Sequence, residues 1–171
     1  MATVSSLRQN FLSPNGFNFT INRLPSVSFF VQTASIPGLT MQGISIPTPF
    51  RTINKHGDKI DYDDLIISVR MDENMGAYIE IFNWMQSLTR SDNFEQYAGL
   101  SGVEAGATGG IYSDATLSIL NSKGNPKILF SFQNIFPLSM TAIDMDTTKT
   151  SVDYVTTNIT FKHSGYTIKT L

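Results

Sequence analysis

The sequence contains no cysteine and only two histidines, His56 and His163, among 171 residues. Without thiols the chain can form no disulfide, no thiolate metal site and no cysteine nucleophile. A catalytic triad needs a histidine beside a nucleophile and a carboxylate, and no nucleophile-elbow motif surrounds either histidine. The sequence therefore predicts a protein that is not an enzyme.

Long apolar runs and clusters of basic residues are also missing. No segment approaches the ~18 apolar residues of a membrane span, and the first ten residues lack the apolar core of a secretory signal peptide. We expect no membrane partner, and synthesis and assembly in a cytoplasm. The lack of a Lys/Arg cluster removes the electrostatic footprint of a tight nucleic-acid binder.

Charge is scarce as well. Charged residues make up 15% of the chain, with a net charge of −2, whereas a typical domain contains about 25%. Serine, threonine, asparagine and glutamine take their place. Such a neutral polar surface favours burial against further copies of the same chain.

The apolar content, in contrast, is ordinary. At 41% hydrophobic residues the chain can build one core, so we expect a single domain over residues 1–171. Residues 1–16 are polar and end in the turn signal Ser-Pro-Asn-Gly, which predicts a flexible N-terminal arm. Residues 91–113 are rich in glycine but lack the Gly-Lys-Ser/Thr of a phosphate-binding loop, and we assign them no role.

Alternation of apolar and polar residues predicts strands through most of the chain. Two alternations flank Leu24-Pro-Ser26 and predict a β-hairpin over residues 17–32. Further strands are expected at 65–71, 115–119, 128–132, 135–146 (interrupted by Pro137), 155–161 and after Gly165. Together they predict about seven or eight strands in a mainly β fold, an antiparallel β-sandwich or barrel with one flanking α-helix.

That helix is predicted directly after the strand at 65–71. Asp72 is the expected N-cap, since its carboxylate can accept from free amides of the first turn. An apolar stripe at helical spacing then runs through Tyr78, Ile81, Phe82, Met85 and Leu88. We expect the helix to end near residue 90 and to pack on the core.

Residues 34–57 combine prolines and glycines with a high apolar content. Pro47 and Pro49 argue against a central strand because each removes a donor from the ladder. The segment is too apolar for a solvated loop, so we expect extended, edge-like chain that packs on another surface. It should continue through Arg51 and close at a turn formed by His56-Gly-Asp58.

Acidic residues flank the predicted strand at 65–71. They are Asp58, Asp61, Asp63, Asp64, Asp72 and Glu73. Their spacing is not that of a calcium-binding loop, which favours a solvated turn and a helix cap over a metal site. We expect no metal and no cofactor. The Asp63-Asp64 pair could instead meet Lys or Arg of a neighbouring subunit.

One stretch carries a family resemblance. Arg51-Thr-Ile-Asn-Lys-His-Gly-Asp58, then Asp63-Asp64, Ser-Val-Arg-Met71, Asp72-Glu73 and Phe82-Asn-Trp84 follow in order. Ile36-Pro-Gly-Leu and Ile44-Ser-Ile-Pro47 precede them. Over residues 17–90 this order resembles the tail tube proteins of contractile-tailed, T-even-type bacteriophages. Residues 112–171 share only a pattern of strands.

The resemblance implies a structural virion protein. Hexameric rings would stack into the inner tube of the tail, inside the sheath and between baseplate and neck proteins, and DNA would pass through the lumen without specific binding. Edge strands would pair between subunits. Candidate contacts between subunits or rings are Ile36, Pro37, Ile44, Ile46, Pro47, Phe50, Arg51, Asp58, Asp63 and Asp64, with residues 1–16.

Two alternatives remain open. The same fold serves tube-initiating, tube-capping and tail-completion proteins, and the related tubes of bacterial secretion systems. A small-ligand-binding β-barrel is the other alternative, and it would need a pocket with convergent polar groups.

Overall fold

The computed structural model describes residues 11–89, 110–148, 150 and 153–171. These residues form nine strands and two helices. Residues 1–10 of the predicted arm and residues 90–109, which include most of the predicted loop 91–113, lie outside the described residues.

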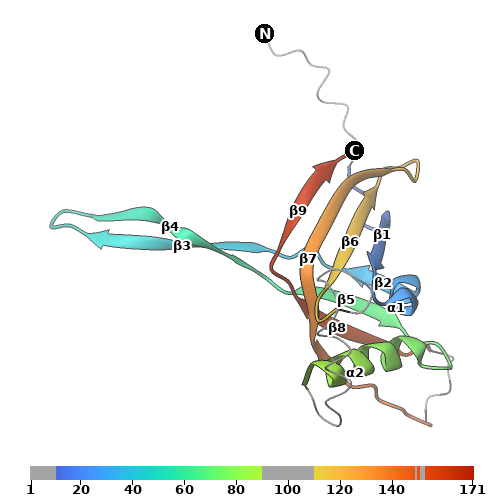
Figure 1. Ribbon diagram of the computed structural model, residues 1–171. Helices are drawn as coiled ribbons and strands as arrows, with labels where there is room; N and C mark the ends of the chain where they lie inside the picture. Colours follow the sequence, from blue (N-terminus) through green and yellow to red (C-terminus); the bar gives the residue numbers. More distant parts are fainter. Residues whose placement is uncertain (1–10, 90–109, 149, 151–152) are drawn as a thin grey trace.

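Two antiparallel sheets share one long strand, which confirms the predicted mainly β, antiparallel fold (Figure 1). The first sheet has the order β1-β6-β7-β9 and the second β7-β8-β5-β2. The strands are β1 (Phe17–Ile21), β2 (Val31–Ala34), β5 (Leu65–Arg70), β6 (Ser113–Leu120), β7 (Pro126–Met140), β8 (Thr156–Lys162) and β9 (Gly165–Thr170).

The shared strand β7 bends from one sheet into the other. Phe132 pairs with Ala115 and Ile135 with Ser113, so β7 has one residue more than β6 between these pairs. Asn134 takes up the extra residue at a φ of 53°, which asparagine tolerates better than most residues, and the Asp114 carboxylate accepts its amide at 3.1 Å. The prediction of a separate strand over 135–146 was wrong, because this bulge carries the strand onward as far as Met140.

Pro137 lies inside β7 and does not end it. From Phe136 onward the described partner of β7 is β8, and the register shifts between Pro137 and Ser139. Pro137 has no backbone amide to donate, and at the edge of the second sheet no neighbouring strand needs that donor.

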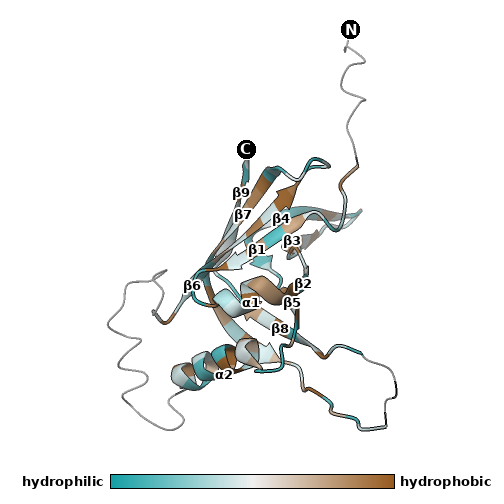
Figure 2. Cartoon of the chain, turned by 90° about the vertical axis from the view of Figure 1, so that its right-hand side faces the viewer, coloured by the Kyte–Doolittle hydropathy of each residue, from teal (hydrophilic) through white to brown (hydrophobic). Residues whose placement is uncertain are grey.

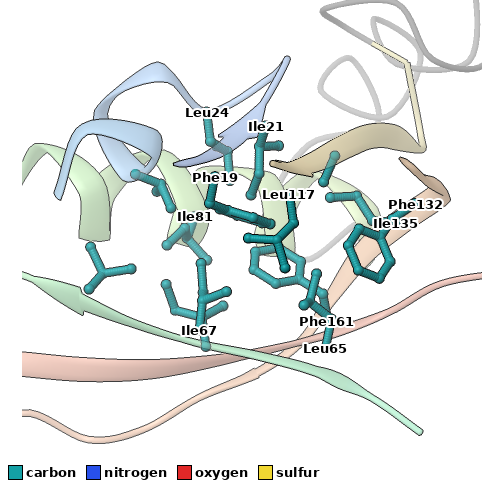
Figure 3. Packing of buried hydrophobic residues seen from close by; sticks show 14 of the residues in the cluster. Phe19, Ile21, Leu24, Leu65, Ile67, Ile81, Leu117, Phe132, Ile135 and Phe161 are labelled. Atoms are coloured by element: carbon teal, nitrogen blue, oxygen red, sulfur yellow. The ribbon is translucent and has the colours of Figure 1, made fainter. Parts of the chain in front are cut away.

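The core lies between the two sheets, and helix α2 (Gly76–Thr89) packs over it (Figure 3). Trp84, Phe19, Phe132 and Phe161 are the largest side chains that are fully buried. The indole nitrogen of Trp84 donates to the carbonyl of Ile111 at 3.3 Å, so its polar atom is paired.

The predicted helical stripe was partly wrong. Ile81 is buried, and Met85 and Leu88 are partly buried against the core. The remaining core contacts of α2 come from Ala77 and Trp84, while the expected Phe82 is 48% exposed. Ala77, Ile81 and Trp84 recur at helical spacing, so the buried face of α2 includes Trp84 and leaves Phe82 beside it.

The prediction of a hairpin over 17–32 was also wrong. Residues Pro25–Phe30 form a second helix, α1, and β1 pairs with β6 instead. Proline at the first helical position is pre-organised for a helix because its φ is fixed and no amide is wasted. Val27 is fully buried, and the Ser28 hydroxyl donates to the carbonyl of Leu24 at 3.0 Å. Alternation over so few residues cannot separate a strand from a helix.

Helix α2 begins four residues after the predicted cap. Residues 72–75 form a turn in which the amide of Met75 donates to the carbonyl of Asp72 at 3.0 Å. The Asp72 carboxylate accepts from the amide of Gly76, the first helical residue, at 2.9 Å. The Asp72 side chain therefore binds a free amide at the start of the helix, as predicted for a cap. It does so from four residues before the first helical residue, across the intervening turn.

Strands β3 (Leu39–Pro47) and β4 (Thr52–Tyr62) form a two-stranded arm that projects from the body (Figure 1). The predicted turn at His56-Gly-Asp58 was wrong, because these residues lie within β4 and the arm turns at residues 48–51. Gly57 sits at a bulge where a Cβ would lie 2.5 Å from the Gln42 carbonyl oxygen. The glycine permits close strand pairing rather than a turn.

Residues of β8, β9 and the turn between them contact the root of the arm, which is the chain just before β3 and just after β4. The Tyr166 hydroxyl donates to the carbonyl of Pro37 at 3.2 Å, and the His163 Nε2 lies 3.1 Å from the carbonyl of Asp63. Lys162 and Asp64 form an ion pair at 2.7 Å. Contacts to both chain segments of the root fix the direction in which the arm leaves the body.

Replacing Trp84 with alanine should lower the free energy of unfolding by about 3–5 kcal/mol, because it removes a fully buried side chain and leaves a cavity. The matched control Phe82→Ala, on the exposed side of the same helix, should cost less than about 1.5 kcal/mol. Urea denaturation of the two variants measures both values, and equal losses would contradict this description of the α2 packing.

Acid should lower the free energy of unfolding through His163, which contacts the root of the arm. Burial lowers the pKa of His163 below its ordinary value of 6.5, against the opposing effect of the Asp63 carbonyl. The unfolded chain therefore binds more protons between the two pKa values, and stability falls as the pH drops from about 6.5 through the folded pKa. The His163→Gln variant should lose less stability than wild type between about pH 7 and about pH 5. Parallel profiles in pH-dependent thermal denaturation would show that His163 does not titrate this way.

Candidate assembly surfaces

The arm formed by β3 and β4 leaves most of its side chains in solvent. All nine residues of β3 are exposed, and in β4 only Gly57 and Tyr62 are partly covered. At about 3.4 Å per residue, β3 alone spans about 30 Å. A two-stranded hairpin is marginally stable in water by itself. The arm is thus the part of the fold that would gain most from contact with another chain.

Apolar side chains on the arm gather in two places. The first, here called the root patch, contains Leu39, Met41 and Ile60, which are 57%, 56% and 51% exposed. Met41 lies opposite Ile60, and Leu39 lies opposite Tyr62. Cross-strand partners share a face, so these side chains form one apolar surface next to the body.

The second place, the tip patch, contains Ile44, Ile46 and Ile53. Ile46 lies opposite Ile53. Because side chains alternate along a strand, Ile44 and Met41 point to opposite faces of the arm. The arm therefore has an apolar patch on one face near its root and another apolar patch on the opposite face near its end.

The turn at the end of the arm presents an aromatic ring and a cation. Phe50 is 98% exposed, and Arg51 follows it. The amide of Thr48 donates to the carbonyl of Arg51 at 3.1 Å, and the Thr48 hydroxyl also contacts that carbonyl. Prolines at 47 and 49 flank Thr48 and stiffen the turn.

Most of the residues predicted to contact other subunits are exposed in the structure, but not all of them. Ile44, Ile46, Pro47, Phe50, Arg51 and Asp58 all lie exposed on the arm, and Ile36 is exposed just before it. Pro37 is buried at the root and so offers little surface to a neighbour. Asp63 is exposed, whereas Asp64 pairs with Lys162 of its own chain.

Open strand edges are a second surface, and sequence reasoning did not locate them. Among the described residues, β9 pairs only with β7 and β1 only with β6, so these two strands are the outer strands of the first sheet. Residues 167–170 of β9 are exposed, including Ile168 at 58%. Unpaired edge groups can accept a strand from another chain. Only the pairing partners of each strand, which alternation does not reveal, could have identified them.

The residues considered for chemistry do not converge. His56 lies on the arm and His163 in the body, at the arm root. Within the described ranges, no group of three or more histidine or acidic side chains is placed to share a metal ion. Among the same residues, no helix has the length and apolar run that crossing a bilayer requires.

The fold recurs in contractile injection systems. The tube-terminating cap of the anti-feeding prophage is 16% identical over the whole of both chains, with a TM-score of 0.64. A chain of the six-fold symmetrised baseplate of the same particle is 11% identical over 95% of this chain and 97% of its own, with a TM-score of 0.66. A chain of the sheath–tube complex of the extracellular PVC injection system is 17% identical over both full lengths, with a TM-score of 0.59.

Sequence comparison identifies the family. No curated protein matches the chain significantly. Residues 2–169, however, match the sequence model of a family described as phage tail tube proteins. This match spans the core, the arm and both open edges. The chain therefore belongs to the phage tail tube protein family.

Proposed function

We propose that six copies of this chain form a ring and that the rings stack into the inner tube of a contractile tail. The observation that carries this proposal is the long exposed arm with apolar patches on both faces, in a chain of the tail tube family. The solved chains of similar fold come from tube, cap and baseplate assemblies, one of them six-fold symmetrised.

The arm and the edges supply separate contacts in this assembly. Edge pairing through β1 and β9 would continue the first sheet from one subunit into the next, which satisfies the open backbone groups. The arm would reach across to further subunits and bury its apolar patches there. Exposed apolar surface of this kind is a feature of interaction sites in soluble proteins.

The charge distribution suits a conduit for DNA. The chain has a net charge of −2 and no basic cluster, so it would make few strong phosphate contacts. DNA in the lumen could then slide during delivery. The sheath would surround the tube, with baseplate and neck proteins at its ends, and the assembled protein would belong to the virion tail.

A tube-terminating or tube-capping role is the second candidate. Its support is the similarity of the fold to a tube-terminating cap, which covers the whole of both chains with a TM-score of 0.64. Tube initiation and tail completion belong to the same class. All of these roles use rings, but in one or two layers rather than a long stack.

A small-ligand-binding role has less support. A groove of about 600 Å³ runs between residues 11–13 and the β6–β7 turn. Isoleucines 119 and 128 line its apolar side and lysines 123 and 127 its polar side. Both lysines are exposed, Lys123 on the turn and Lys127 at the start of β7, and such a site lacks the convergent buried polar groups that orient a ligand.

Electron microscopy of the purified protein should show six-fold rings or tubes of stacked rings, because the arm and the edges remain open in a single copy. Quantifying the protein per particle then separates the two candidate roles. Dozens of rings indicate the repeating tube subunit, whereas one or two rings indicate a terminator, cap or completion protein. A strictly monomeric protein at high concentration would contradict both.

Replacing residues 43–50 with a Gly/Ser linker should abolish stacking while the body stays folded, because none of these residues belongs to the core. The matched control replaces the exposed β6–β7 turn, residues 122–125, in the same way and should assemble normally. Sedimentation reports assembly and circular dichroism reports folding. Tubes of unchanged length and yield from the first variant would exclude the arm from the contacts between rings.

A further inference from the structure

A small apolar pocket lies beyond the end of β5, at the start of helix α2. Its volume is about 290 Å³. It is lined by Met71, Asp72, Glu73, Met75, Ile143, Met145, Asp153, Tyr154 and Val155. Three flexible methionines among nine lining residues make a surface that can adapt to an inserted side chain.

The pocket also has a negative rim. Asp72, Glu73 and Asp153 are among its lining residues, and no lysine, arginine or histidine is. Glu73 and Asp153 are exposed, while Asp72 binds the first amide of α2. Arg70 is not a lining residue, but its guanidinium lies 4.2 Å from the centre of the ring of Tyr154, which is one. The exposed carboxylates of Glu73 and Asp153 outnumber this cation, so the rim has an excess of negative charge.

The end of the arm has the complementary character. Phe50 is 98% exposed and Arg51 follows it, while Lys55 is exposed further along β4, opposite Ile44. No acidic residue occurs between Pro47 and Gly57. An aromatic side chain next to a cation, in a segment without carboxylates, matches an apolar pocket rimmed by carboxylates in both hydrophobicity and charge.

The two surfaces lie at opposite ends of β5. The arm returns to the body at Tyr62, just before β5 begins, and the pocket begins at Met71, just after β5 ends. In Figure 1 the arm extends to one side of the body while the β5 arrow points to the other. The arm points away from the pocket of its own chain, so only a second copy can bring the two together.

We propose that the end of the arm of one copy docks into this pocket of a second copy, with Phe50 seated among the methionines and Arg51 facing Glu73 and Asp153. The proposed contact is head-to-tail: each arm enters the pocket of the next copy, and repetition of the contact gives closed rings or open stacks. A reciprocal exchange of arms within a two-fold dimer would instead give crosslinked dimers and no ladder. The inference rests on the proposed self-assembly and names the surface that receives the arm.

A designed crosslink tests the contact directly, because the chain has no cysteine of its own. Assembled Phe50→Cys/Met145→Cys protein should give a ladder of covalent oligomers on mild oxidation. An equimolar mixture of the two single variants should give covalent dimers of one copy of each. The matched control pairs Phe50→Cys with Ser122→Cys, on the exposed β6–β7 turn, and should not give a ladder.

A charge exchange tests the same contact without oxidation. Arg51→Glu and Glu73→Arg should each raise the protein concentration required for assembly about tenfold, the effect of losing an interface anchor. Combining the two should restore most of the loss, since the opposite charges meet again. The control Lys123→Glu should leave assembly unchanged.

The outcomes separate this inference from the proposed function. If wild type forms tubes but the cysteine pair gives no ladder and the charge exchange no rescue, the arm docks elsewhere and the inference is overturned. If Phe50 crosslinks only to a sheath or baseplate protein in whole particles, the occupant of the pocket is not a second copy. If wild type forms no oligomer under any condition, the proposed function fails, and the inference fails with it.

Discussion

The fold depends on strand β7 pairing in both sheets. Its first half pairs with β6 and β9 and its second half with β8, and the bulge at Asn134 turns it between them. This arrangement brings Phe132 from one sheet and Phe161 from the other into a single core. The carboxylate of Asp114 holds the Asn134 amide, so a strained backbone position has a specific partner. Without the bend, the two sheets would lack a common strand and the core would open along one side.

The apolar residues discussed above fall into two groups, one buried in the body and one exposed on the arm. Those between the sheets and under α2 are buried in the single chain and stabilise it. Those on the arm, which points away from the viewer in Figure 2, are exposed in the single chain. The root contacts of Tyr166 and His163 join the two parts, so the body aims an arm that takes no part in its core. Folding and assembly can therefore be altered by different substitutions.

Alternation of apolar and polar residues predicted those strands that have one buried face and one more accessible face. In β5 and β6 one side is buried and the other is not, so Leu65 and Ile67 or Leu117 and Ile119 reveal the strand by their spacing. Helix α1 could not be found this way, because Val27 and Phe29 fit the strand period while Val27 and Phe30 fit the helical one, and six residues do not decide between the two. Composition predicted that residues 34–57 form extended, edge-like chain, and strands β3 and β4 of the arm are extended and exposed. The methionine-lined pocket could not, because its residues come from two distant stretches of sequence that share no periodicity.

The bulge at Gly57 also determines what the arm can present. Two-stranded ribbons with polar residues on both faces are prone to slip, and a slip by one residue exchanges the two faces. A strand with one pairing irregularity fits its partner at a single alignment, since Gly57 alone can lie against the Gln42 carbonyl. The glycine therefore acts as a register lock. It ensures that every copy of the chain shows the same side chains in the same order along the arm.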